Sequence, residues 1–221
     1  MSAGALYPIF SKEFPEIQPV GTVAFQLLTG QPSVLPEPAQ SQNAAAFRFA
    51  TSYGARFVQL SKTNFVYQTN EPYLGWKDFR TALMQHWSAY AKVANPTAIV
   101  KIGLRYINRI VKSKEKASLS DWIKATPDLP SALIASRQHF LGRVESSPSQ
   151  SHLKLLTLSS EPPGPDWPQG TIIMDIDRIN MDPHGATEPK ILENLELLHE
   201  DIWSSFDSAA TETLKNYLSG K

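Results

Sequence analysis

The run Ile99–Ile110 constrains the fold of this chain more than any other segment. Apolar side chains alternate along it with charged or small ones: Val100, Ile102, Leu104, Tyr106 and Ile110 against Lys101, Gly103, Arg105 and Arg109. Successive side chains of a β-strand point to opposite faces of its sheet. This period of two therefore predicts a strand in a sheet that has one dry face and one charged face.

The composition excludes several classes of protein. The 221 residues include 21 basic and 21 acidic side chains and no cysteine. A net charge of zero argues against a general nucleic-acid-binding or membrane-surface-binding protein, because both classes need an excess of basic residues. Without cysteine there are no disulfides, no thiol catalysis and no cysteine-bound zinc. Pro8, Lys12 and Glu13 interrupt any signal-peptide core, and no window approaches the roughly 18 apolar residues of a membrane span, so a cytoplasmic location is expected.

Two segments have the period of an amphipathic helix. The first is predicted to begin after Gly75 and to stop at Asn95-Pro96, and the second to begin after a Thr187 cap. Their apolar stripes are Trp76, Phe79, Leu83, Trp87, Tyr90 and Ala94 in the first, and Ile191, Leu195, Leu198, Ile202, Phe206, Ala210, Leu214 and Tyr217 in the second. Stripes of this kind pack against a sheet or another helix.

The other segments predict an antiparallel sheet within one domain, 1–221. Residues 1–20 have no clear period, while further strands are expected at 22–28, 45–50, 55–60, 65–69, 133–145, 153–158 and 171–179. Proline-rich loops are expected at 31–43 and 159–170. The turns between the later strands are too short for parallel crossovers. The predicted class is α+β: a mostly antiparallel sheet of about six or seven strands, with two amphipathic helices packed on one face.

Several ordered motifs resemble one known family. They are Phe14-Pro15, Arg56–Leu60, Tyr73–Phe79, the run Gly-Leu-Arg-Tyr-Ile-Asn-Arg at 103–109, and Asp175-Ile-Asp177 before a C-terminal helix. Together they resemble the uncharacterised bacterial "sporadically distributed protein" family, over about residues 8–215. The resemblance implies no catalytic residues. Family members usually carry an extra apolar strand before the Phe-Pro region. This chain starts too late to contain it: either the start is truncated or this member dispenses with that strand. If the strand is absent, a sheet edge is uncovered, and pairing of that edge with another chain is expected.

The sharpest candidate site is a set of charges on the polar face of the sheet. Arg105 and Arg109 share one face of their strand, and Asp175 and Asp177 share one face of theirs. On neighbouring strands they would form a charge ladder. Arginines could then bind phosphate oxygens and the aspartates Mg²⁺. The alternative is a solvated face with ordinary cross-strand ion pairs, each worth roughly 0.2–1 kcal/mol.

A second set of residues could extend this face or contact a partner. Arg137, His139 and Arg143 could widen the basic surface, although an exposed strand would look the same. Exposed aromatic residues beside glycine or proline are typical of partner contacts, and the candidates are Tyr73, Trp76 and Trp167. The aromatic stripe at 76–90 otherwise has the spacing of a helix core.

Known catalytic templates do not occur in the sequence. There is no Gly-x-Ser-x-Gly elbow, no phosphate-binding loop, no Gly-x-Gly-x-x-Gly and no His-x-x-x-His or His-Glu-x-x-His. The sequence therefore favours a non-catalytic interaction or accessory protein without a cofactor, whose partner is another protein or a second copy of itself. The alternative is a nucleotide- or phosphate-binding protein or enzyme that uses Arg105, Arg109, Asp175 and Asp177 with Mg²⁺. Of these three functions, nucleic-acid binding is the one that the sequence favours least.

Overall fold

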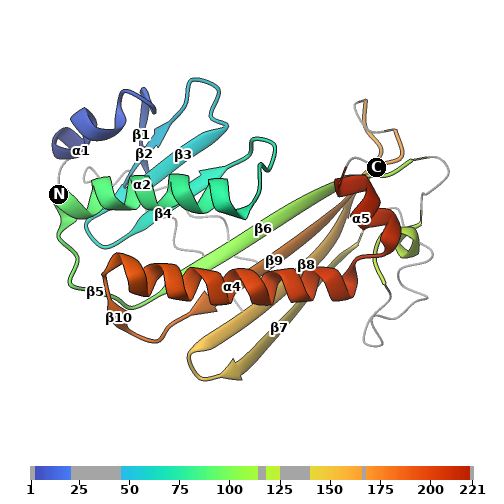
Figure 1. The fold of residues 1–221 in the computed structure, drawn as a ribbon. Coiled ribbons are helices and arrows are strands. Elements are labelled where there is room, and N and C mark those ends of the chain that lie inside the picture. Colours follow the sequence, from blue (N-terminus) through green and yellow to red (C-terminus); the bar gives the residue numbers. More distant parts are fainter. Residues whose placement is uncertain (1–2, 21–45, 114–117, 125–139, 166–167, 220–221) are drawn as a thin grey trace, which may run out of the picture. The chain divides into compact units, whose positions relative to one another are not determined.

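The computed structural model describes residues 3–20, 46–113, 118–124, 140–165 and 168–219. The chain divides into two compact units, Met1–Pro96 and Thr97–Lys221. Each unit builds one four-stranded antiparallel sheet and packs helices on it (Figure 1). The predicted class, α+β with mostly antiparallel strands, is confirmed. The single domain over 1–221 stays a prediction.

The first unit is a meander of strands with two helices. Its elements are α1 (Ala3–Phe10), β1 (Glu16–Val20), β2 (Ala46–Ala50), β3 (Arg56–Ser61), β4 (Phe65–Thr69) and α2 (Trp76–Ala94), and the sheet order is β1-β2-β3-β4. The three strands predicted between 45 and 69 are confirmed. The expectation that residues 1–20 are irregular is wrong, because α1 buries Leu6 and Phe10 in the core and β1 pairs with β2. Those tertiary contacts stabilise segments whose own periodicity is weak.

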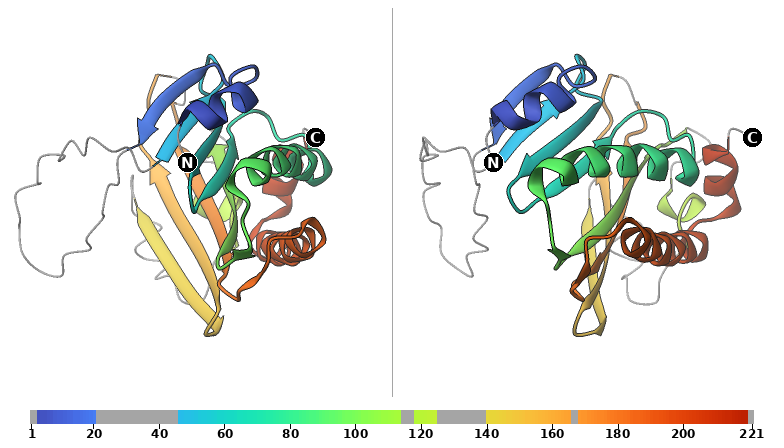
Figure 2. Two further views of the ribbon diagram at one scale, coloured as in Figure 1. Left: turned by 90° about the vertical axis from the view of Figure 1, so that its left-hand side faces the viewer. Right: turned by 60° about the vertical axis from the view of Figure 1, so that its left-hand side comes forward.

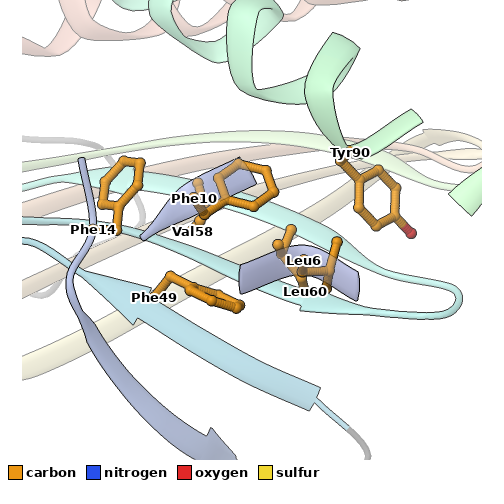
Figure 3. Packing of buried hydrophobic residues seen from close by; sticks show 7 residues of the cluster. All are labelled: Leu6, Phe10, Phe14, Phe49, Val58, Leu60 and Tyr90. Atoms are coloured by element: carbon orange, nitrogen blue, oxygen red, sulfur yellow. The ribbon is translucent and has the colours of Figure 1, made fainter. Parts of the chain in front are cut away.

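One apolar cluster holds the first unit together (Figure 3). Phe49 on β2 lies opposite Val58 on β3 in the strand register, so both side chains point to the same face of the sheet. On that face they meet Phe10 from α1, whose ring centroid lies 5.8 Å from that of Phe49. The other members of the cluster are Leu6, Phe14, Leu60 and Tyr90. Both helices of the unit therefore cover one face of its sheet.

The ends of α2 are where the sequence predicted them. Gly75 precedes the helix with φ 111°, a conformation that favours glycine. Asn95 ends it in the left-handed conformation, with φ 46° and ψ 55°, and its N–H donates to the carbonyl of Ala91. Asparagine tolerates this conformation, and Pro96 cannot continue the helix.

The second unit is a sheet of long strands with one long helix along it. Its elements are β5 (Ala98–Ile99), β6 (Ile102–Val111), the 3₁₀ turn η1 (Leu119–Asp121), β7 (Leu141–Ser149), β8 (His152–Glu161), β9 (Thr171–Asn180), β10 (His184–Gly185), α4 (Glu188–Ala209) and α5 (Glu212–Leu218). The sheet order is β6-β9-β8-β7, and β10 pairs separately with β5. Figures 1 and 2 show α4 running along one face of this sheet.

The alternation in the opening run is confirmed within β6. Leu104 and Ile110 are buried, while Arg105 and Arg109 are exposed. The run is not one strand, however: β5 ends at Ile99, and Val100 between the two strands is 68% exposed rather than on the dry face. Ala98 and Ile99 instead pair with His184 and Gly185.

The second predicted helix is broken into α4 and α5. Ile191, Leu195, Leu198, Ile202 and Phe206 are buried as the stripe predicts. The chain leaves the helix at Ala210, which forms a β-bridge with Ile123. Thr211 then starts α5 by accepting a hydrogen bond from the N–H of Leu214, while its own hydroxyl donates to the carbonyl of Asp121. The spacing of the apolar residues does not reveal this break, because the buried stripe continues across it through Ala210 and Leu214.

Two further expectations about the architecture are corrected. In the described part of the chain, the strands form two four-stranded sheets and one short pair instead of a single sheet of six or seven. Periodicity assigns residues to faces, but the partner of each strand depends on contacts far apart in sequence. The loop predicted at 159–170 begins later, because Ser159, Ser160 and Glu161 belong to β8 and pair with β9.

Some predictions lie outside the described residues. These are the strand at 22–28, the loop at 31–43, and residues 133–139 of the strand at 133–145. Within the described residues, no helix has the length and apolar character needed to cross a membrane.

Candidate functional site

The predicted charges do meet on one face of the second sheet. We call the face opposite α4 the outer face. On it, Arg105 of β6 stands opposite Asp177 of β9, and its guanidinium donates two hydrogen bonds to Asp175, at 2.8 and 2.5 Å. The Arg105 side chain is 56% exposed and that of Asp175 is 14% exposed. The two-bond geometry is that of a strong arginine–carboxylate pair, and it engages the same donors that a phosphate would need.

Arg109, on the same face of β6, is paired with a different carboxylate. It donates to Glu161 of β8 at 3.3 Å, and the same carboxylate accepts a hydrogen bond from the hydroxyl of Thr171 at 2.6 Å. The structure thus brings Arg105, Asp175 and Asp177 together and pairs Arg109 with Glu161. Glu161 was not singled out from the sequence, because its place beside Arg109 depends on the order β6-β9-β8.

On the outer face, the surroundings of the Asp177 carboxyl group disfavour its charged form. Burial raises its pKa, and the neighbouring charge of Asp175 raises it further, while Arg105 and Lys101 act in the opposite direction. A carboxyl whose pKa is higher in the folded than in the unfolded protein destabilises the fold once it ionises. Ionised Asp177 therefore costs stability at neutral pH.

Replacing Asp177 with asparagine is expected to raise the free energy of unfolding at pH 7. Below the unfolded-state pKa of aspartate the carboxyl is protonated in both states, so the gain should vanish there. Urea unfolding at neutral and acidic pH measures the difference. Asp175→Asn is the matched control and should destabilise at pH 7, because Asp175 receives both donors of Arg105. A loss of stability in Asp177→Asn at pH 7 would contradict this account.

Of the other predicted site residues, Arg143 of β7 lies on the outer face, because it stands opposite Thr157 of β8, which in turn stands opposite Asp175 of β9. Arg137, His139 and Trp167 lie outside the described residues. Tyr73 and Trp76 belong to the first unit: Tyr73 is 54% exposed, while the ring of Trp76 stacks on Phe79 at the start of α2. Leu74 between them is 80% exposed. Tyr73 and Leu74 therefore form a small apolar surface, and Trp76 belongs partly to the aromatic packing of the helix.

A second charged cluster, which the sequence analysis missed, lies beneath α4. Arg178 of β9 points toward the helix and is only 5% exposed. Its guanidinium donates to Asp201 of α4 at 2.7 Å, to the hydroxyl of Ser205, and to the carbonyls of Leu155 and Asp177. The sequence did contain a signal for this cluster. Arg178 continues the alternation of Ile172, Met174 and Ile176, which places its side chain on the dry side of β9.

The carboxylate of Asp201 links this cluster to the surface. It accepts one hydrogen bond from Arg178 and one from Lys154 at 2.6 Å. Burial acts to raise the pKa of Asp201, but these two cations outweigh it and lower the pKa. The carboxylate is thus held ionised between two cations, which fastens α4 to β8 and β9.

Two shallow depressions open beside this cluster, of about 210 and 280 Å³. They share the side chains of Asn180, Asn194 and Leu197, and Asn180 donates to Asn194 at 2.7 Å. The larger depression includes Lys154 and Arg178, both of which already bind the carboxylate of Asp201. In the smaller one Lys190 is paired with Glu193 at 2.8 Å. In the described part of the chain, no group of three metal-ligating side chains is present.

The most open element of the second unit is β7. It is the last strand of its sheet within the described residues, and eight of its nine residues are exposed. The exposed fractions are 77% for Leu141 and 52% for Val144. From Leu141 to Ser146, β7 pairs regularly with β8. The register shifts between Ser146 and Ser149. A regular, apolar-bearing edge of this kind is a template for a further strand.

Comparison with protein-family models, with curated proteins and with solved structures finds no match to this chain. The likeness to the sporadically distributed family therefore stays a prediction.

Proposed function

We propose that this chain is a non-catalytic interaction protein that binds another polypeptide along the edge strand β7. The observation that carries the proposal is the exposure of that strand, with Leu141 and Val144 open to solvent on a regularly paired segment. An added strand obtains main-chain hydrogen bonds from such an edge, and side-chain pockets supply the specificity. Soluble proteins usually protect edges of this length.

The arrangement of charges on the outer face supports the same proposal. Arg105 and Arg109 are engaged by Asp175 and Glu161, so an anionic ligand would have to compete with carboxylates for their donors. Displacing the carboxylate from a two-bond pair of this type costs more free energy than binding an arginine that has no carboxylate partner. The nucleotide- or phosphate-binding alternative therefore has less support from the geometry than strand addition has.

A substitution on β7 tests the proposal. Val144→Asp places a charge at the centre of the exposed strand and should reduce binding of the partner at least about tenfold, since desolvating an unpaired charge is costly. Tagged wild-type and variant chains are compared by capture from a lysate of the source cells and by light scattering of the purified protein. Leu74→Asp, at an apolar site in the first unit that is more exposed than Val144, is the control and should retain the partner.

The proposal is wrong if wild type and Val144→Asp capture the same proteins in the same amounts. It is equally wrong if the wild-type chain binds neither another protein nor itself. Circular dichroism of the variant verifies that the fold is intact, which is expected because Val144 is half-exposed.

A further inference from the structure

The sequence of β7 is complementary to itself. Arg143 and Glu145 lie on the same face of the strand, on either side of Val144, and form an ion pair at 2.7 Å. Both side chains remain about half exposed, at 54% and 55%. If a second β7 runs antiparallel to the first with Val144 opposite Val144, each Arg143 stands directly opposite the other chain's Glu145. Opposite charges in directly facing positions stabilise antiparallel strands.

From this complementarity we propose that the occupant of the β7 edge is a second copy of this chain. The proposal rests on the proposed function, which requires only that some polypeptide binds at β7. In the dimer a two-fold axis passes beside Val144, and the two four-stranded sheets join into one of eight strands. The four charges form a ring in which each arginine has a glutamate on both sides. On the opposite face of the joined sheet the two Val144 side chains meet.

The length of the regular segment sets the expected strength of the dimer. Between Gly142 and Ser146 five residues of each chain face one another, and the irregularity beyond Ser146 ends the ladder. Pro148 has no N–H to offer a further bond. A contact of five residue pairs is smaller than a standard protein interface, so we expect a dissociation constant on the order of 1–100 µM.

Charge-swapped variants distinguish this arrangement from any other. Arg143→Glu would place four carboxylates around the axis, and Glu145→Arg would place four guanidinium groups there. Each single variant should weaken the dimer at least about tenfold, because facing like charges repel strongly in an interface. The double variant Arg143→Glu/Glu145→Arg restores the alternation and should dimerise like the wild type. An equimolar mixture of the two single variants should form a heterodimer.

Sedimentation velocity and light scattering of the full chain, between about 1 and 200 µM, measure these equilibria. Salt offers an additional readout, since screening should weaken the wild-type dimer and strengthen the single variants. Lys112→Glu, a charge change in the same unit but not on β7, is the control and should leave the dimer unchanged.

Three results would overturn the second-copy proposal. They are a wild-type chain that stays monomeric up to about 200 µM, a dimer that both single variants leave unchanged, or a mixture of single variants without heterodimer. If the chain is monomeric while Val144→Asp still abolishes capture of a different protein, the second-copy proposal fails and the interaction at β7 stands. If it is monomeric and nothing is captured, both fail.

Discussion

Replacing Arg178 with alanine is expected to lower the free energy of unfolding by about 3 kcal/mol, the lower end of the cost of breaking a buried ion pair. The guanidinium bonds the carboxylate of Asp201, the hydroxyl of Ser205 and two main-chain carbonyls beneath α4. Alanine would leave these acceptors without their donor. The lower end of the range applies because Lys154 still neutralises part of the Asp201 charge.

Urea unfolding of wild type and variant measures this loss, and Arg105→Ala is the matched control. Arg105 also makes a two-bond pair in the same sheet, but its side chain is 56% exposed, so its removal should cost no more than about 1 kcal/mol. Arg178→Lys should restore part of the stability, since an ammonium group cannot reproduce the planar fork. Equal losses in Arg178→Ala and Arg105→Ala would show that burial does not govern the contribution of these pairs.

Acidification should reduce the difference between wild type and Arg178→Ala. The pKa of Asp201 is lower in the folded protein than in the unfolded chain. The stabilisation is therefore fully present above the unfolded-state pKa of aspartate and is lost as the pH falls through the folded-state value. Repeating the unfolding experiment between neutral pH and pH 3 (roughly one unit below the usual aspartate pKa) measures the trend.

Replacing Phe49 with alanine is expected to destabilise the first unit by about 4 kcal/mol, in the range of buried phenylalanine truncations. The Phe49 side chain is fully buried, and its ring packs on Phe10 of α1. Its removal leaves a cavity between the sheet and the helix. Hydrogen exchange of the full chain should show the largest loss of amide protection in β2 and β3.

Tyr53 is the matched aromatic control for this substitution. It lies in the turn between β2 and β3 and is 97% exposed. Tyr53→Ala should change the free energy of unfolding by less than about 0.5 kcal/mol. A loss below about 1 kcal/mol in Phe49→Ala would indicate that the cluster of Leu6, Phe10, Phe14, Phe49, Val58, Leu60 and Tyr90 is not a close-packed core.

The candidate site could be predicted only in part. The shared face of Arg105 and Asp175 follows from strand period, and their ion pair follows once β6 and β9 are neighbours. That Arg109 pairs with Glu161 could not be predicted, because it requires β8 to lie beyond β9. Arg178 and Asp201 are 23 residues apart on different elements, and their contact exists only because α4 crosses the sheet at that point.

The sequence by itself determined the local features of this protein: which side of β6 is dry, where α2 begins and ends, and that the strands are antiparallel. These features depend on backbone geometry and on caps formed by residues a few positions apart. Only the tertiary structure decided that the strands form two sheets, that Ala210 leaves the helix to meet Ile123, and that an arginine lies buried under α4. Each of these depends on contacts between distant segments, whose free energy is absent from any local window of the chain.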